Sequence, residues 1–256
     1  MKSFWTKAAI AAAAIGCVGA AQAAVFNIDF EHVDTSNAPF APYFITDGDY
    51  VTQSGFAVGL YDNNNSTTSP DGALVGALVN GSDPTTCLDG VCPRNNATNY
   101  LASLNDGVMF LNNGGGKLTL NSFSAAFLAP AGVTLSSGTA AYLAVEADRS
   151  NGTYAVGIFA LAGPSSGDTS FANYIASNAT IIGGTGTLTS GNVTSLFAYA
   201  YYCNPTTGSC NFGTSDRGQF GIDNISISAV PETSSWLLMV AGMGALGAMA
   251  RRRRSV

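Results

Sequence analysis

Basic residues and histidine are scarce in this sequence. The 256-residue chain has one histidine, and its ten Lys and Arg stand against sixteen Asp and Glu, so the net charge is −6. Six of the ten basic residues lie at the two ends, which leaves four against fifteen acidic residues between Asp29 and Asp223, a net charge of −11. Binding to duplex nucleic acid needs clustered Lys and Arg, so we exclude nucleic acid as a partner. A single histidine, His32, also gives little basis for histidine metal sites or Ser-His-Asp catalysis.

Long helical periodicity is absent from the interior of the chain. Apolar and polar residues alternate in short runs, separated by clusters of Gly, Asn, Ser and Thr, and this pattern is typical of short antiparallel strands. The clearest runs are Phe26/Ile28/Phe30, Leu118/Leu120, Leu143/Val145 and Tyr154/Val156/Ile158. We therefore predict an all-β domain over residues 24–229, an antiparallel β-sandwich of two packed sheets.

The last strand of this domain changes parity partway along. Phe220 and Ile222 are at even-numbered positions, whereas Ile225 and Ile227 are at odd-numbered ones, so in a regular strand the two pairs would face opposite sides. A one-residue slip turns the following side chains to the opposite face, so a bulge near Asp223-Asn224 would keep both pairs buried.

The first 23 residues predict a secretory signal helix. Lys2 and Lys7 form the charged start, an apolar run covers residues 8–20, and the small-residue site at 21–23 predicts cleavage after Ala23. A permanent amphipathic anchor and lipidation of Cys17 are the alternatives.

The C-terminal residues 230–256 combine three unlike features. Val230-Pro231-Glu232-Thr233 is followed by an apolar stretch, Trp236 to Ala250, and then by Arg251, Arg252, Arg253 and Arg254. A helix of fifteen residues at about 1.5 Å each reaches about 22 Å, less than the roughly 30 Å of membrane hydrocarbon, so it spans only marginally. The arginines act as a stop-transfer signal that keeps the C-terminus in the cytoplasm.

These three features, in this order, resemble the PEP-CTERM sorting signal of Gram-negative bacteria, which a membrane protease called exosortase reads. Thr233 departs from the family pattern, where a second proline is usual, and an ordinary tail anchor is the alternative. Residues 26–31, 115–123 and 219–227 also look like the β-sandwich bodies of exosortase-sorted proteins, which resemble jelly-roll carbohydrate-binding modules. The resemblance implies export through the secretion translocon, a transient inner-membrane anchor, exosortase as a partner, and release to the cell surface or extracellular matrix.

Four cysteines remain after removal of the signal peptide: Cys87, Cys92, Cys203 and Cys210. An even number in an exported chain indicates disulfides, and four cysteines allow three connectivities. We favour pairing between neighbours in the sequence, because turn-forming residues lie within each pair. A zinc site with these spacings in a secreted protein is the weaker alternative.

The resemblance to jelly-roll modules also implies a structural calcium where the first and last strands meet. That role would fall to Glu31 and Asp223, with Asp29 or Asp34 nearby, although no full set of ligands is evident and solvated loop carboxylates are the favoured alternative. No other cofactor is expected.

Three aromatic residues alternate along one predicted strand, Phe197, Tyr199 and Tyr201. They would form a flat platform for stacking against sugar rings if Leu196, Ala198, Ala200 and Tyr202 were the buried face. The opposite assignment, with the rings in the core, is favoured here because burying rings is the larger gain in free energy.

These patterns predict a non-enzymatic surface or matrix protein associated with extracellular polysaccharide. A secreted polysaccharide hydrolase is the alternative from another class, with Glu31, Glu146 and loop aspartates as the available carboxylates, but nothing marks a catalytic pair. An ice-binding protein is a third, suggested by Leu118-Thr119-Leu120 and the threonines of residues 185–189.

Overall fold

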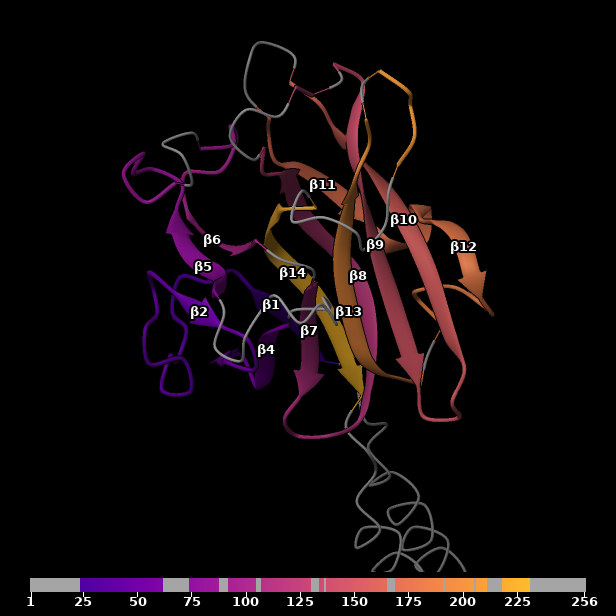
Figure 1. Cartoon of the computed structure of the whole chain (residues 1–256). Coiled ribbons are helices and arrows are strands. Elements are labelled where there is room, and N and C mark those ends of the chain that lie inside the picture. The colour runs from indigo at the N-terminus through magenta and orange to yellow at the C-terminus, as the bar shows by residue number, and fades with distance from the viewer. Residues whose placement is uncertain are drawn as a thin grey trace, which may run out of the picture. The chain divides into compact units, whose positions relative to one another are not determined.

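In the part of the chain that the computed structural model describes, strands make up nearly all the regular secondary structure (Figure 1). The structure describes residues 24–61, 74–87, 92–104, 107–129, 134–135, 137–164, 169–190, 192–204, 206–210 and 218–230. Residues Val25–Ala229 form one compact unit. The expected signal helix and the expected C-terminal helix lie outside the described residues.

Fourteen strands and one 3₁₀ turn lie in the ranges that the structure describes. In chain order they are β1 (Ala24–Ile28), β2 (Ile45–Thr46), β3 (Tyr50–Gln53), β4 (Phe56–Tyr61), β5 (Leu74–Asn80), β6 (Asn99–Ser103), β7 (Gly107–Asn112), β8 (Lys117–Phe127), β9 (Thr139–Arg149), β10 (Tyr154–Ala162), β11 (Ala172–Ile175), η2 (Ala176–Asn178), β12 (Thr180–Gly184), β13 (Val193–Tyr202) and β14 (Phe220–Val230).

Hydrogen bonding links the strands through β13. One branch runs β12-β10-β9-β13 and continues through β7 and β4 to β3, and the other runs β8-β14-β6-β5-β2, with β11 beside β8 and β1 beside β14. The two branches meet where Val193 of β13 pairs with Leu118 of β8. We call them the first and the second sheet. The predicted all-β antiparallel class is confirmed.

The main core contains buried side chains of both sheets in one cluster. Leu143 and Val145 of β9 belong to it together with Leu118 and Leu120 of β8, so the predicted inward parity of these strands is confirmed. The run at Tyr154, Val156 and Ile158 does share a face, but the core face of β10 is the other one, which carries Phe159 and Leu161. The faces of the two sheets that bear these side chains therefore pack against each other.

The predicted irregularity in the last strand is present at Asn224. This residue has a φ of 50°, in the left-handed region, and the flanking apolar residues Phe220, Ile222, Ile225 and Ile227 are all buried. The parity change that the sequence predicts is thus accommodated by a single residue. One consequence is that Asp223 lies fully buried just before the kink, with an exposed fraction of 0%.

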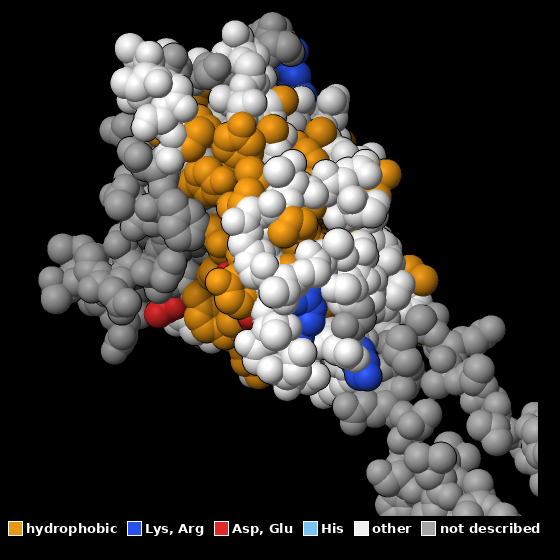
Figure 2. All heavy atoms as spheres, turned by 90° about the vertical axis from the view of Figure 1, so that its right-hand side faces the viewer, with side chains coloured by type: hydrophobic (Ala, Val, Ile, Leu, Met, Phe, Trp, Pro, Cys, Tyr) orange, Lys and Arg blue, Asp and Glu red, His pale blue; other side chains and the backbone are white. Residues whose placement is uncertain are grey.

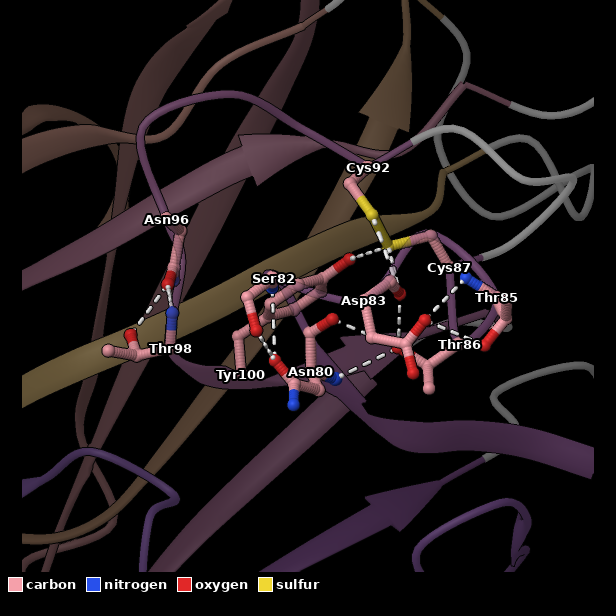
Figure 3. The surroundings of a disulfide bond; sticks show 10 residues. All are labelled: Asn80, Ser82, Asp83, Thr85, Thr86, Cys87, Cys92, Asn96, Thr98 and Tyr100. Atoms are coloured by element: carbon pink, nitrogen blue, oxygen red, sulfur yellow. Dashed lines mark hydrogen bonds between the residues drawn. A yellow bond between two sulfur atoms is a disulfide. The ribbon is translucent and has the colours of Figure 1, made fainter.

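Both predicted disulfides are formed, Cys87–Cys92 and Cys203–Cys210. Figure 3 shows the first one above a loop whose turns are closed by Asn80 and Asp83 side chains, which accept hydrogen bonds from Ser82 and from Thr85. Cys87 Sγ lies 3.9 Å from the hydroxyl oxygen of Tyr100. Two disulfides indicate that the protein matures in an oxidising compartment.

Both cysteines of this disulfide pack in a second, smaller hydrophobic cluster. The cluster contains Val79 of β5, Tyr100 of β6, Cys87 and Phe171, and the rings of Tyr100 and Phe171 meet edge to face with centroids 5.1 Å apart. These residues alternate with those that face the main core, so they lie on the outer face of the second sheet. That face is therefore covered by the chain itself.

The conformation of Asn224 leads to a stability prediction. Asn224→Ala and Asn224→Gly both remove the same side-chain hydrogen bond to Asp223. Glycine has no Cβ and adopts a left-handed backbone without strain, whereas alanine is strained in that conformation. We expect the alanine variant to be less stable than the glycine variant by about 1 kcal/mol, measured by urea denaturation. Equal stabilities would show that the backbone at residue 224 is not strained.

Candidate functional site

The aromatic residues of β13 point away from the core. Leu196 and Ala198 are 1% and 2% exposed and face the main core, whereas Phe197, Tyr199 and Tyr201 are only partly buried. The expectation that the rings fill the core is wrong. The main core already contains bulky side chains from neighbouring strands, including Phe110, Phe123, Phe127, Leu143 and Phe159, and β13 contributes small residues opposite them.

The three rings keep part of their surface out of water by lying against one another and against the sheet. Phe197 and Tyr199 have centroids 5.4 Å apart, and Tyr201 stacks on Tyr142 of β9 with centroids 5.6 Å apart at 30°. Gly107 of β7 is opposite Tyr199, and a Cβ atom added to it would lie 2.2 Å from the Phe197 ring. The Phe197 ring therefore occupies the position that a side chain at residue 107 would take. We call Tyr142, Phe197, Tyr199 and Tyr201 the ring face.

The surface around the ring face is largely apolar. Cross-strand partners lie on the same face of a sheet, so Met109 of β7 lies beside Phe197, and Ala144 of β9 lies beside Tyr199. Figure 2 shows hydrophobic side chains gathered in a band on the side of the molecule where β10 and β12 lie. Tyr154 of β10 is 46% exposed and belongs to the same outer face.

Two carboxylates interrupt this apolar surface. Glu146 of β9 lies directly opposite Phe197, and Asp148 lies opposite Ser195, whose hydroxyl donates a hydrogen bond of 3.1 Å to Asp148 Oδ2. Burial raises the pKa of Glu146, and the charge of Asp148 and a hydrogen bond shared with it raise that pKa further. Glu146 and Asp148 lie two positions apart in the sequence, on the same face of β9.

The phenol of Tyr199 remains neutral over a wide pH range. Burial raises the pKa of Tyr199 to about 12, and the nearby Glu146, Tyr201 and Tyr154 contribute to the increase. At physiological pH this hydroxyl keeps its proton. A neutral phenol is both a hydrogen-bond donor and an acceptor.

The basic residue at the end of β9 serves the fold. Arg149 donates hydrogen bonds to the carbonyl oxygens of Thr185 and Thr187, at 2.7 and 2.9 Å, and to the hydroxyl of Ser190. It thereby holds the turn that follows β12. The threonines of residues 185–189 are part of this turn, so they do not form the flat strand array that ice binding would need.

The meeting point of the first and last strands forms a hydrogen-bonded network. Asp223 accepts hydrogen bonds from Asn96 Nδ2 at 2.8 Å, from the Asn224 backbone at 2.7 Å and from Thr98. Burial raises the pKa of Asp223 to about 6; these hydrogen bonds lower it, and the charge of Asp29 adds to the rise.

Glu31 and Asp29 lie near the same meeting point but have partners of their own. Glu31 accepts a hydrogen bond of 2.7 Å from the backbone N–H of Asn99, and Asp29 accepts one of 2.6 Å from Gln53. Asp34 binds the backbone of Ser36 instead.

This network does not fit a calcium ion as it stands. Amide N–H groups occupy the carboxylate oxygens that a cation would need, and Asn96 is held in that orientation because its Oδ1 accepts from Thr98. Within the described ranges, no three His, Cys, Asp or Glu side chains come together as a metal-holding group. These contacts leave calcium at Glu31 and Asp223 untested, and of the two alternatives we carry forward the one without a bound ion.

The remaining predicted residues are scattered or lie outside the described part of the chain. Glu31 lies in the exposed loop after β1, where it contacts the start of β6, whereas Glu146 belongs to β9; His32 is exposed in the same loop as Glu31. Val230 ends β14, whereas Pro231, Glu232, Thr233 and the four C-terminal arginines are outside the described residues. Among the residues that are described, no helix has the length and apolar character that crossing a membrane requires.

Tyr142, Asp148 and Gly107 belong to this surface but were not predicted from the sequence. The sequence does carry a signal for the first two: the apolar residues Leu143 and Val145 mark one face of β9, so Tyr142, Glu146 and Asp148, at the other parity, share the opposite face. Gly107 had no such signal, because its role depends on the pairing of β7 with β13.

No known protein family matches this chain, and no curated protein shows significant similarity to it. The class of the protein therefore rests on its fold and on the residues described above.

Burial of Asp223 predicts a pH dependence of stability. Because the folded-state pKa is raised from 3.8 to about 6, the stability that this group contributes is full below about pH 4 and is lost as the pH rises through 6. We expect the melting temperature of Asp223→Asn to fall less between pH 4 and 7 than that of the wild type.

Asp34→Asn is the control for this experiment, because hydrogen bonds to Ser36 lower the pKa of that exposed carboxyl. It should leave the slope between pH 4 and 7 unchanged. Addition of calcium should not raise the melting temperature. A rise that disappears in Asp223→Asn would contradict the hydrogen-bonded network and establish a calcium site.

Proposed function

We propose that the protein is an exported, non-enzymatic surface or matrix protein of a Gram-negative bacterium, whose jelly-roll-like body binds extracellular polysaccharide through the ring face. The observation that carries this proposal is the orientation of β13, which leaves Phe197, Tyr199 and Tyr201 partly exposed in one row. Partly exposed aromatic rings on a sheet offer apolar contact area with little conformational entropy to lose on binding.

Several features support a role for these rings beyond packing. Tyr142 and Tyr201 stack across neighbouring strands, so their positions are held by the sheet before any ligand arrives. The Tyr199 hydroxyl and the carboxylates of Glu146 and Asp148 border the rings. A sugar presents apolar C–H faces and hydroxyl groups together, and this combination of rings and polar groups is complementary to both.

The terminal segments support export and transient anchoring. The two disulfides accord with an oxidising environment outside the cytoplasm. The resemblance of residues 230–254 to a PEP-CTERM signal supports recognition by exosortase, cleavage near Pro231-Glu232 and release of the body from the membrane. A matrix protein with few charges would then lie among hydrated polysaccharide chains.

Removing rings should weaken polysaccharide binding. We expect Phe197→Ala/Tyr199→Ala to lower the affinity of the full-length protein for the polysaccharide of its own producing cells at least tenfold, because each stacked ring contributes about 1 kcal/mol. Affinity electrophoresis or calorimetry measures this. Tyr43→Ala removes a 73% exposed tyrosine from a loop and is the matched control, which should bind normally. Equal binding by all three proteins would rule out the ring face as the binding site.

Processing should depend on the sorting motif. The intact mass of the protein recovered from the outer layer should correspond to a chain that begins at Ala24 and ends near Pro231-Glu232. In Pro231→Ala/Glu232→Ala, or in cells without exosortase, we expect the C-terminal segment to remain and the protein to stay in the membrane fraction. Ser234→Ala is the control. A full-length chain in the membrane of cells with an active exosortase would contradict this prediction.

A further inference from the structure

Glu146 and Asp148 place negative charge within the ring face. Glu146 is opposite Phe197 and Asp148 is opposite Ser195, so both carboxylates lie on the same side of the sheet as the rings. Burial and the neighbouring Asp148 disfavour the charged form of Glu146 and raise its pKa, which indicates that this pair already repels. A ligand that lies along the rings therefore comes close to the carboxylates of Glu146 and Asp148. On β9, the one basic residue that could neutralise their charge is Arg149.

Arg149 does not compensate this charge. It is the only basic residue in the strands β7, β9, β10 and β13. Its guanidinium group donates to two carbonyl oxygens and a hydroxyl of the turn after β12, which directs it away from the carboxylate pair. The binding surface is therefore apolar and acidic, with hydrogen-bond acceptors in excess of donors.

We propose that the ring face selects neutral and amine-bearing polysaccharides and rejects polyanionic ones, with Glu146 and Asp148 as the residues that determine this specificity. This inference rests on the proposed function of the ring face. Sugar hydroxyls and ammonium groups donate hydrogen bonds to carboxylates, and such bonds to an ionised acceptor are stronger than neutral ones. A uronate or carboxymethyl group at the same position brings a third negative charge next to two that are partly desolvated.

The test compares polymers that share a backbone and differ in charge. The full-length protein is titrated at 0.15 M NaCl, where the screening length is about 8 Å, so that distant charges contribute little. The probes are hydroxyethylcellulose against carboxymethylcellulose, and chitosan oligosaccharides against the corresponding chitin oligosaccharides. We expect the neutral polymer to bind at least tenfold more tightly than its carboxymethylated counterpart, and the amine-bearing oligosaccharides to bind at least as tightly as the acetylated ones.

Substitutions then locate the specificity. Glu146→Gln/Asp148→Asn should bring the affinity for carboxymethylcellulose to within about threefold of that for hydroxyethylcellulose. Asp34→Asn/Asp83→Asn removes the same number of charges from exposed sites elsewhere, and should keep the preference of the wild type. A preference lost equally in both double variants would show that overall charge, and not this pair, is responsible.

The outcomes separate this inference from the proposed function. If no polymer binds, or if binding is unaffected by Phe197→Ala/Tyr199→Ala, the proposed function fails. If the rings are required but the two charge classes bind equally, only the inference about specificity fails. Wild-type binding that is abolished by EDTA also overturns the inference, because the carboxylates would then act through a bound cation.

Discussion

The architecture depends on how the space between the two sheets is filled. Bulky side chains such as Phe110, Phe123 and Phe159 already occupy it, and close packing leaves β13 room for Leu196, Ala198 and Ala200 on its inner side. Successive side chains of a strand point to opposite faces, so three rings of β13 must then face outward. The ring face is thus a consequence of packing on the other side of the same strand.

The two outer faces of the sandwich differ as a result. On the outer face of the second sheet, Tyr100 and Phe171 are buried in a cluster that includes Cys87 of the Cys87–Cys92 disulfide. The outer face of the first sheet keeps its rings partly exposed, supported by lateral stacking and by the space above Gly107. This asymmetry places the candidate binding surface on one sheet and a buried cluster on the other.

Much of the fold could be predicted because it depends on local patterns. Two-residue alternation identified the strands, turn residues between the cysteines favoured the neighbouring disulfides, and the parity change at Asp223-Asn224 located a kink that Asn224 adopts with its φ of 50°. The orientation of the rings was predicted wrongly, because a rule based on the burial of single side chains ignores the volume that other strands already fill. The hydrogen bond between Asn96 and Asp223 could not be predicted either, because the two residues are 127 positions apart in the chain.

The sequence by itself determined the strand class, the kink in the last strand and the expectation of export, and it favoured the disulfide pairs that the structure then showed, because each follows from residues that are close together in the chain. Only the tertiary structure decided which face of β13 is buried, that Tyr142 and Gly107 join the ring face, and that Glu146 and Asp148 border it. These depend on strand pairing and on the shared volume of the core, which residues far apart in the chain fill together.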